Sequence, residues 1–235
     1  GREGPGPVLT EATFTPSVAK ALEGEDVPLE TYHFVLNDIS EDTSGETFVD
    51  GGKEASVEGA GTAAFGEITY DQEGTYVYEI TETEGQTTGM DYSDNTVTIT
   101  VVVTEENGEL KAEGTITGGD NENHELVNEY TKPEASATLC VTKAVNGLYD
   151  GDETFEFKLA KVDDATSDVI ANDTAEAENG ATATFEAIKY TEEGDYYYSI
   201  TEQSGDTTGM FYDAAAKYAY VHVEMKGGEL QATTS

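Results

Sequence analysis

The stretch Tyr76-Val77-Tyr78-Glu79-Ile80-Thr81-Glu82 alternates side chains with the period of a β-strand. The alternation places the two tyrosines and the isoleucine on one face, and the carboxylate of Glu82 ends that row. The same pattern returns at residues 196–202, where it ends at Glu202. Burying an ionised carboxylate is costly unless the group is neutralised or paired. Each inward glutamate therefore predicts a partner or a task elsewhere in the chain.

The composition indicates a strongly acidic, all-β protein. The 235 residues include 49 acidic and 11 basic side chains, which give a formal net charge of -38 at pH 7. This charge alone resembles that of a disordered polyanion. However, the 14 Tyr and 8 Phe lie in alternating runs separated by Gly, Asn and Asp, which is typical of short strands joined by turns. Because the negative charge repels phosphates, we expect neither a nucleic acid nor an anionic membrane surface as a partner.

Other functional classes have little support in the sequence. The single Cys140 cannot form an internal disulfide. The three histidines, His33, His124 and His222, lie far apart, and the acidic turn at 119–123 lacks the ordered spacing of a calcium loop, so we expect no metal and no cofactor. No phosphate-binding loop or nucleophile motif is present, and we expect no enzyme. No apolar run approaches the length of a membrane span.

The chain consists of two related halves. Lys143 lies 123 positions after Lys20, and three alternating core residues in each half keep this offset. After an acidic, Gly-containing stretch at residues 37–58 the offset falls to 120, at which Thr207-Thr208-Gly209-Met210 repeats an identical run in the first half. Such a repeat predicts two tandem domains of one fold, each an antiparallel β-sandwich of the Ig-like kind.

Four segments follow from the repeat and from the linker composition. We expect a flexible leader at 1–11, a first β-sandwich at 12–131, a linker at 132–138 and a second β-sandwich at 139–235. Loops absorb length changes, so we expect the acidic excursions of both halves, residues 37–58 and 162–179, to lie on the surface outside the core.

Two further inward polar residues accompany Glu82. In an expected first strand over residues 12–20, Lys20 shares a face with Val18, and in a last strand over residues 124–130, Asn128 shares a face with Leu126. Either residue alone is usually a snorkelling lysine or a hydrogen-bonded core amide. Burial lowers a lysine pKa and raises a glutamate pKa, so a buried pair can exchange a proton and become neutral. Folding would then hold the amine against the amide.

The motifs around these residues resemble a known family. Lys20, Tyr32-x-Phe34-x-Leu36, Gly74-x-Tyr76-x-Tyr78-x-Ile80-x-Glu82 and Val127-Asn128-x-Tyr130 are similar to the streptococcal pilin isopeptide-linkage domain of the FctA type, found in Gram-positive major pilins and surface stalks. The resemblance implies a spontaneous amide bond between Lys20 and Asn128, with Glu82 as proton shuttle and ammonia leaving. It implies the same roles for Lys143 and Glu202.

The second half differs from the first in one respect. The position equivalent to Asn128 would be 248, which lies beyond Ser235. We therefore expect a second domain that has its lysine and glutamate but lacks the asparagine strand. A donor strand would fill the resulting groove, from the chain's own continuation, a neighbouring molecule or an added peptide.

The expected function is mechanical. The resemblance implies a pilus shaft subunit or an adhesin stalk, extracellular on a Gram-positive cell surface or cell wall, with neighbouring pilin or stalk domains as partners. Two alternatives remain open. One is a ligand-binding adhesin module, which an exposed aromatic patch would favour. The other is an engineered split domain that accepts a peptide strand carrying Asn.

Overall fold

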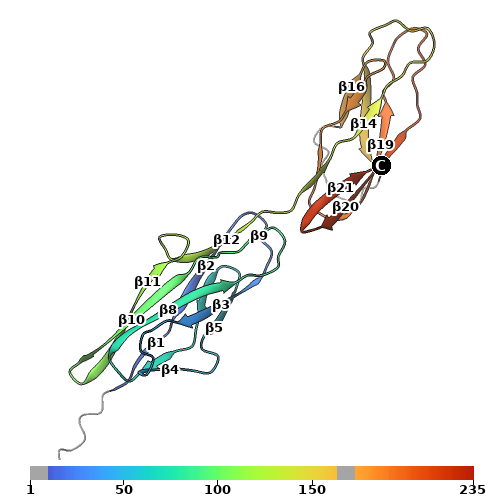
Figure 1. The fold of residues 1–235 in the computed structure, drawn as a ribbon. Coiled ribbons are helices and arrows are strands. Elements are labelled where there is room, and N and C mark those ends of the chain that lie inside the picture. The colour runs from blue at the N-terminus through green and yellow to red at the C-terminus, as the bar shows by residue number, and fades with distance from the viewer. Residues whose placement is uncertain (1–9, 163–172) are drawn as a thin grey trace, which may run out of the picture. The chain divides into compact units, whose positions relative to one another are not determined.

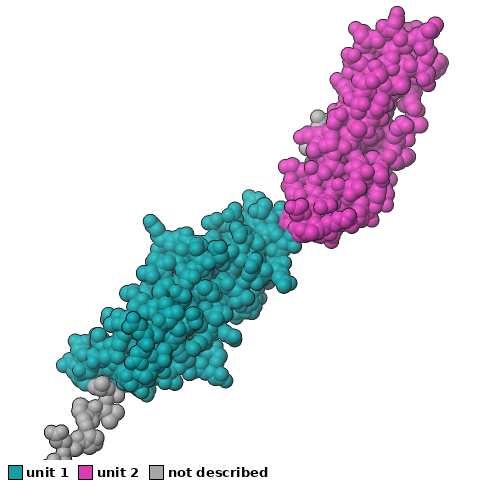
Figure 2. Space-filling model, in the orientation of Figure 1, with its two compact units in different colours: residues 1–132 teal, residues 133–235 magenta. Residues whose placement is uncertain are grey.

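The computed structural model describes residues 10–162 and 173–235 and divides the chain into two compact units, Gly1–Lys132 and Pro133–Ser235 (Figure 1; Figure 2). The predicted all-β class is confirmed, because every regular element of the described residues is a strand. The described residues accordingly contain no helix long and apolar enough to cross a membrane. Most of the expected leader lies outside the described residues.

Unit 1 is built from three sheets among its described residues. Their strand orders are β1-β7-β4, β11-β10-β8-β3-β5 and β6-β2-β12-β9. The strands are β1 (Ala12–Phe14), β2 (Ser17–Glu23), β3 (Thr31–Asp38), β4 (Glu46–Phe48), β5 (Glu54–Glu58), β6 (Gly61–Ala64), β7 (Ile68–Tyr70), β8 (Gly74–Thr83), β9 (Met90–Asp91), β10 (Val97–Glu106), β11 (Glu109–Gly118) and β12 (Glu125–Tyr130).

The core of unit 1 lies between the five-stranded sheet and the other two sheets. In β8 the inward residues Tyr76, Tyr78 and Ile80 are buried, as the period-2 alternation predicts. Val18 of β2 and Leu126 of β12 belong to the same buried cluster, which closes the sandwich from the opposite side.

The pairing of β2 with β12 positions the functional residues. These two strands run parallel, with Leu126 opposite Lys20 and Asn128 opposite Leu22. This pair is an exception to the antiparallel order that the sequence predicts. As a result, Lys20 and Asn128 lie on neighbouring strands although they are 108 positions apart in the sequence.

Two expectations for unit 1 require correction. The single first strand expected over residues 12–20 is divided at Pro16, so that β1 pairs with β7 whereas β2 pairs with β6 and β12. Proline has no N–H for a ladder hydrogen bond, which explains the break. The acidic stretch at 37–58 contains β4 and β5, and Phe48 packs against the core, so the expectation of a surface segment outside the core is wrong.

Unit 2 repeats part of this plan. Its sheets have the orders β13-β18, β14-β17 and β16-β15-β19-β20-β21. The strands are β13 (Ala135–Ala137), β14 (Cys140–Thr142), β15 (Phe155–Lys161), β16 (Thr174–Ala177), β17 (Thr182–Thr184), β18 (Ile188–Tyr190), β19 (Gly194–Glu202), β20 (Lys217–Lys226) and β21 (Glu229–Thr234).

Strand β13 lies inside the range expected to be linker, 132–138. Ala135 and Ala137 are buried, and β13 pairs with β18 as β1 pairs with β7 in unit 1. Small apolar residues at alternate positions can therefore form a core strand where composition alone indicates a linker. Of the second excursion, 162–179, residues 163–172 lie outside the described residues, and β16 forms part of the remainder.

Candidate functional site

Three polar side chains meet in the core of unit 1. Lys20 comes from β2, Glu82 from the end of β8 and Asn128 from β12. The side chains of Lys20 and Glu82 are fully buried, and Asn128 has no exposed surface. Lys20 Nζ lies 2.6 Å from Glu82 Oε1, while Asn128 Nδ2 donates a hydrogen bond of 2.6 Å to Glu82 Oε2. One carboxylate thus bridges the amine and the amide.

Burial controls the charge of Lys20. Desolvation lowers the pKa of its ammonium group, and the contacts with Glu82 oppose that shift only in part. Nζ lies at ion-pair distance from Oε1 and 5.1 Å from the centre of the Tyr32 ring. A lysine in this setting can reach the neutral, nucleophilic form at a smaller cost than an exposed one.

The carbonyl of Asn128 has its own donor. The backbone N–H of Ser93 donates a hydrogen bond of 2.8 Å to Asn128 Oδ1. A fixed backbone donor at this oxygen polarises the carbonyl and would stabilise negative charge that develops there. The sequence pattern does not reveal this group, because a backbone N–H has no side-chain signature.

Asp120 contacts the segment that carries the Ser93 donor, and the sequence pattern does not reveal this residue either. Its Oδ2 accepts hydrogen bonds from Ser93 Oγ and from the backbone N–H of Val127, each 2.6 Å long. Burial favours the neutral acid, but these hydrogen bonds keep the pKa of Asp120 below its ordinary value. Asp120 therefore ties the segment after β9 to the strand that carries Asn128.

Unit 2 brings together Lys143 and Glu202. Lys143 Nζ donates a hydrogen bond of 2.8 Å to Glu202 Oε2 and lies 4.3 Å from the centre of the Phe155 ring. Both side chains are nearly buried. Glu202 Oε1 is buried and has no hydrogen-bond partner. In unit 1 one oxygen of Glu82 contacts the lysine, and the other oxygen accepts the hydrogen bond from the Asn128 amide.

A groove of about 770 Å³ opens beside this pair. Its lining includes Val141 and Val145 from the β14 segment, and Met210 and Tyr212 from the segment after β19. In unit 1 the corresponding elements, β2 and β9, both pair with β12. In the described part of unit 2, β14 pairs with β17 alone, and no strand occupies the position of β12.

The described residues provide no metal centre. Among residues 10–162 and 173–235, no grouping of three or more His, Cys, Asp or Glu side chains is arranged to hold a metal ion.

These features define a class of protein: a β-sandwich in which a buried glutamate joins a lysine and an asparagine from neighbouring parallel strands. The family model of the Spy0128-like isopeptide containing domain, FctA, matches residues 16–131 and 139–235, and the chain belongs to this family.

Solved structures with similar folds include major pilins of Streptococcus pyogenes. The T-13 major pilin protein of serotype GAS131465 has 16% sequence identity and a TM-score of 0.41, over 96% of this chain and 98% of that chain. A second S. pyogenes major pilin has 19% identity and a TM-score of 0.43, over 94% and 96%. No curated protein matches the chain.

Proposed function

We propose that the chain is a structural subunit of a pilus shaft or an adhesin stalk, extracellular on a Gram-positive cell surface, in which an amide bond between Lys20 and Asn128 closes unit 1. The observation that carries the proposal is the position of Glu82, whose two oxygens contact Lys20 Nζ and Asn128 Nδ2. Membership of the isopeptide-containing family supports the same conclusion.

The reaction uses each contact in turn. Lys20 passes a proton to Glu82 Oε1, and the neutral Nζ attacks the side-chain carbonyl carbon of Asn128. The Ser93 N–H stabilises the resulting oxyanion. The protonated Glu82 then delivers a proton to Nδ2, so the carbon–Nδ2 bond breaks as the new carbon–Nζ bond remains. Lys20 loses two protons in all, which leave with Nδ2 as ammonium.

This chemistry occurs once per molecule and serves mechanics rather than turnover, so the protein is not an enzyme in the ordinary sense. Lys20 and Asn128 lie on adjacent parallel strands, although one is near the beginning and the other near the end of the unit 1 sequence. Tension that enters through β2 would pass across the amide bond to β12 and leave towards unit 2. The 108 positions between them would carry little of the load.

Intact mass under denaturing conditions tests the proposal. The wild-type chain should weigh one ammonia less than its sequence mass for the bond in unit 1, and Glu82→Ala should restore the full mass. The matched variant Glu202→Ala removes the equivalent carboxylate of unit 2 and should leave the deficit unchanged. A wild-type chain of full sequence mass would contradict the proposal.

For unit 2 we propose that the groove beside β14 binds a donor strand equivalent to β12. The asparagine of this strand would contact Glu202 as Asn128 contacts the glutamate of unit 1. The buried Glu202 Oε1, which has no hydrogen-bond partner, and the groove that opens beside it support this arrangement. In unit 1 the equivalent seat holds Leu126, Asn128 and Tyr130 on one inward face. Such a strand, from the chain's own continuation, from a neighbouring subunit or supplied as a peptide, would react with Lys143 by the same steps.

A synthetic peptide with the sequence of residues 124–131 tests the donor-strand proposal. Mixed with the chain, it should give a covalent adduct on a denaturing gel, and Lys143→Ala or Glu202→Ala should abolish it. A peptide with alanine in place of the asparagine should bind without forming the adduct and serves as the control. Binding without any adduct from the asparagine peptide would show that the groove accepts a strand but lacks the chemistry.

A ligand-binding adhesin module is the second candidate function. It is favoured by one observation, an exposed aromatic face on unit 2 where Tyr197 and Tyr218 are 51% and 74% exposed. This function is compatible with a crosslinked stalk, since it uses a different face of the protein.

A further inference from the structure

The outer face of β19 and β20 carries a group of aromatic and charged side chains, which we call the tyrosine face: Asp195, Tyr197, Tyr218, Tyr220, His222 and Glu224. The strand register places Asp195 opposite His222, and Tyr197 opposite Tyr220. The neighbouring inward residues of β19 are buried in the core of unit 2, so the tyrosine face points to solvent.

The rings of this face lie close to one another. The ring centres of Tyr197 and Tyr220 are 5.1 Å apart with an interplanar angle of 30°, and those of Tyr220 and His222 are 6.4 Å apart at the same angle. Exposed hydrophobic side chains scattered singly need no explanation, whereas a contiguous aromatic patch marks an interaction site. The arrangement is a ladder of flat surfaces along β20.

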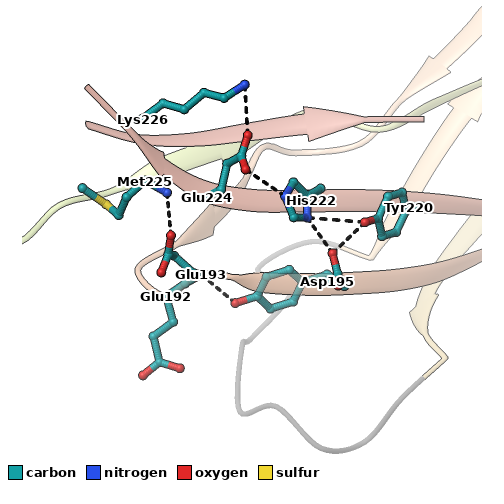
Figure 3. Close-up of polar contacts among 9 residues, drawn as sticks. Glu192, Glu193, Asp195, Tyr220, His222, Glu224, Met225 and Lys226 are labelled. Atoms are coloured by element: carbon teal, nitrogen blue, oxygen red, sulfur yellow. Dashed lines mark hydrogen bonds and ion pairs between the residues drawn. The ribbon is translucent and has the colours of Figure 1, made fainter. Parts of the chain in front are cut away.

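Carboxylates hold two of these rings, those of Tyr220 and His222, as Figure 3 shows. Asp195 Oδ1 accepts a hydrogen bond of 2.6 Å from Tyr220 and lies 2.6 Å from His222 Nδ1. Glu224 lies on the other side of the imidazole, with Oε2 3.3 Å from Nε2 and Oε1 3.0 Å from Lys226 Nζ. The hydroxyl and imidazole are fixed from two sides, so the ring faces are preorganised for a ligand.

Unit 1 shows that the fold does not require these residues. At the equivalent places on β8 and β10 it has threonine and valine: Thr75 opposite Val102, and Val77 opposite Thr100. These residues form an equally regular pair of strands. The aromatic and acidic side chains of unit 2 are therefore an addition to the sheet rather than a condition for it.

We infer that the tyrosine face binds a cationic segment of a partner protein, through arginine side chains that stack on its rings and pair with its carboxylates. An arginine guanidinium is planar and is recognised both by aromatic faces and by carboxylates. The net charge of -38 attracts basic partners over a long range and repels acidic ones. The inference goes beyond the proposed crosslink and does not depend on it.

The test uses the full chain, uniformly ¹⁵N-labelled, and three synthetic peptides of equal length that repeat Arg-Gly, Lys-Gly and Ser-Gly. Titration with the Arg-Gly peptide at about 0.15 M salt, the physiological ionic strength, should shift the amide signals of β19 and β20. The Lys-Gly peptide should bind more weakly, because lysine cannot stack as a plane. The Ser-Gly peptide should give no shift.

Substitution by the residues of unit 1 provides the decisive variant. Tyr197→Val with Tyr220→Thr keeps β-formers at both positions and should weaken Arg-Gly binding roughly fivefold to 30-fold, the expectation for two exposed cation–π contacts. Glu186→Gln removes one exposed negative charge elsewhere in unit 2 and should change binding less than about twofold, as a screened surface charge does.

Three results would overturn the inference. The first is equal binding of the Arg-Gly and Lys-Gly peptides with shifts spread over the acidic surface, which would mean attraction by net charge alone. The second is unchanged affinity in the tyrosine variant. The third is concentration-dependent broadening of the β19 and β20 signals without peptide, which would mean that a second copy of the chain covers this face. None of these results bears on the mass deficit that tests the crosslink.

Discussion

The double substitution Lys20→Met with Glu82→Gln isolates the energetic effect of the proposed crosslink. Methionine retains the length and apolar stem of the lysine, and glutamine retains the shape of the glutamate. Neither substitute carries a charge, so the variant leaves no unpaired buried charge in the site. The remaining change in stability should therefore report the loss of the amide bond.

The magnitude follows from the length of the closed segment. Lys20 and Asn128 are 108 positions apart, and a covalent link that closes a loop of this size stabilises a protein by about 4 to 5 kcal/mol through the unfolded state. We expect the unfolding free energy of unit 1 to fall by this amount. The slowest-exchanging amides of β8 and β10 should then exchange on the order of 1000-fold faster, because their exchange reports global unfolding.

Native-state hydrogen exchange, followed by mass spectrometry of peptides from each unit, measures this change in the full chain. The matched control is Lys143→Met with Glu202→Gln, because no strand in the described part of unit 2 takes the position of β12 and brings an asparagine to this pair. The unfolding free energy of unit 2, measured from the exchange of its amides, should change by no more than about 1 kcal/mol, the scale of an ordinary substitution. A loss below about 1 kcal/mol in the unit 1 variant would refute the reasoning, because the chain-entropy value for a link of this span is several times larger.

Three further predictions concern force, pH and the support of the site. In single-molecule pulling, the crosslink should keep the segment between Lys20 and Asn128 from extending. The extension of unit 1 on unfolding should therefore be shorter by roughly 360 to 390 Å than in the Glu82→Ala variant, which should extend fully. Burial and the neighbouring Asp38 raise the pKa of Glu46 to about 7, above its ordinary 4.5. The stabilisation from this neutral acid should therefore be complete below pH 4.5 and lost as the pH rises through 7, and Glu46→Gln should flatten that part of the stability–pH curve measured by urea denaturation. Asp120→Ala should release the donor segment and slow crosslinking in freshly refolded protein by on the order of tenfold, measured as the appearance of the mass deficit, and an unchanged rate would remove Asp120 from the account.

The sequence predicted the elements of the site that depend on side-chain alternation. Lys20, Glu82 and Asn128 each occupy an inward position of a strand, and a period of two is enough to find such positions. The repeat located Lys143 and Glu202 in the same way. The structure adds the information that alternation cannot contain, namely that β2 and β12 are neighbours and that one carboxylate contacts both partners.

The missed parts of the site and fold have physical reasons. Ser93 contacts Asn128 through its backbone N–H, and Asp120 lies in a turn, so neither belongs to a periodic pattern. The acidic stretch at 37–58 is polar on average, yet a few residues such as Phe48 suffice to anchor it to the core. Pro16 was a readable signal for the break between β1 and β2, because proline interrupts a ladder.

The most direct test of the central claim is tandem mass spectrometry of the denatured chain after proteolysis. An amide bond at Lys20 should block tryptic cleavage there and yield one branched species, in which the peptide of Lys20 is joined to the peptide of Asn128 with the loss of one ammonia. Recovery of the two peptides separately, with an unmodified Lys20 and an intact Asn128, would contradict the account.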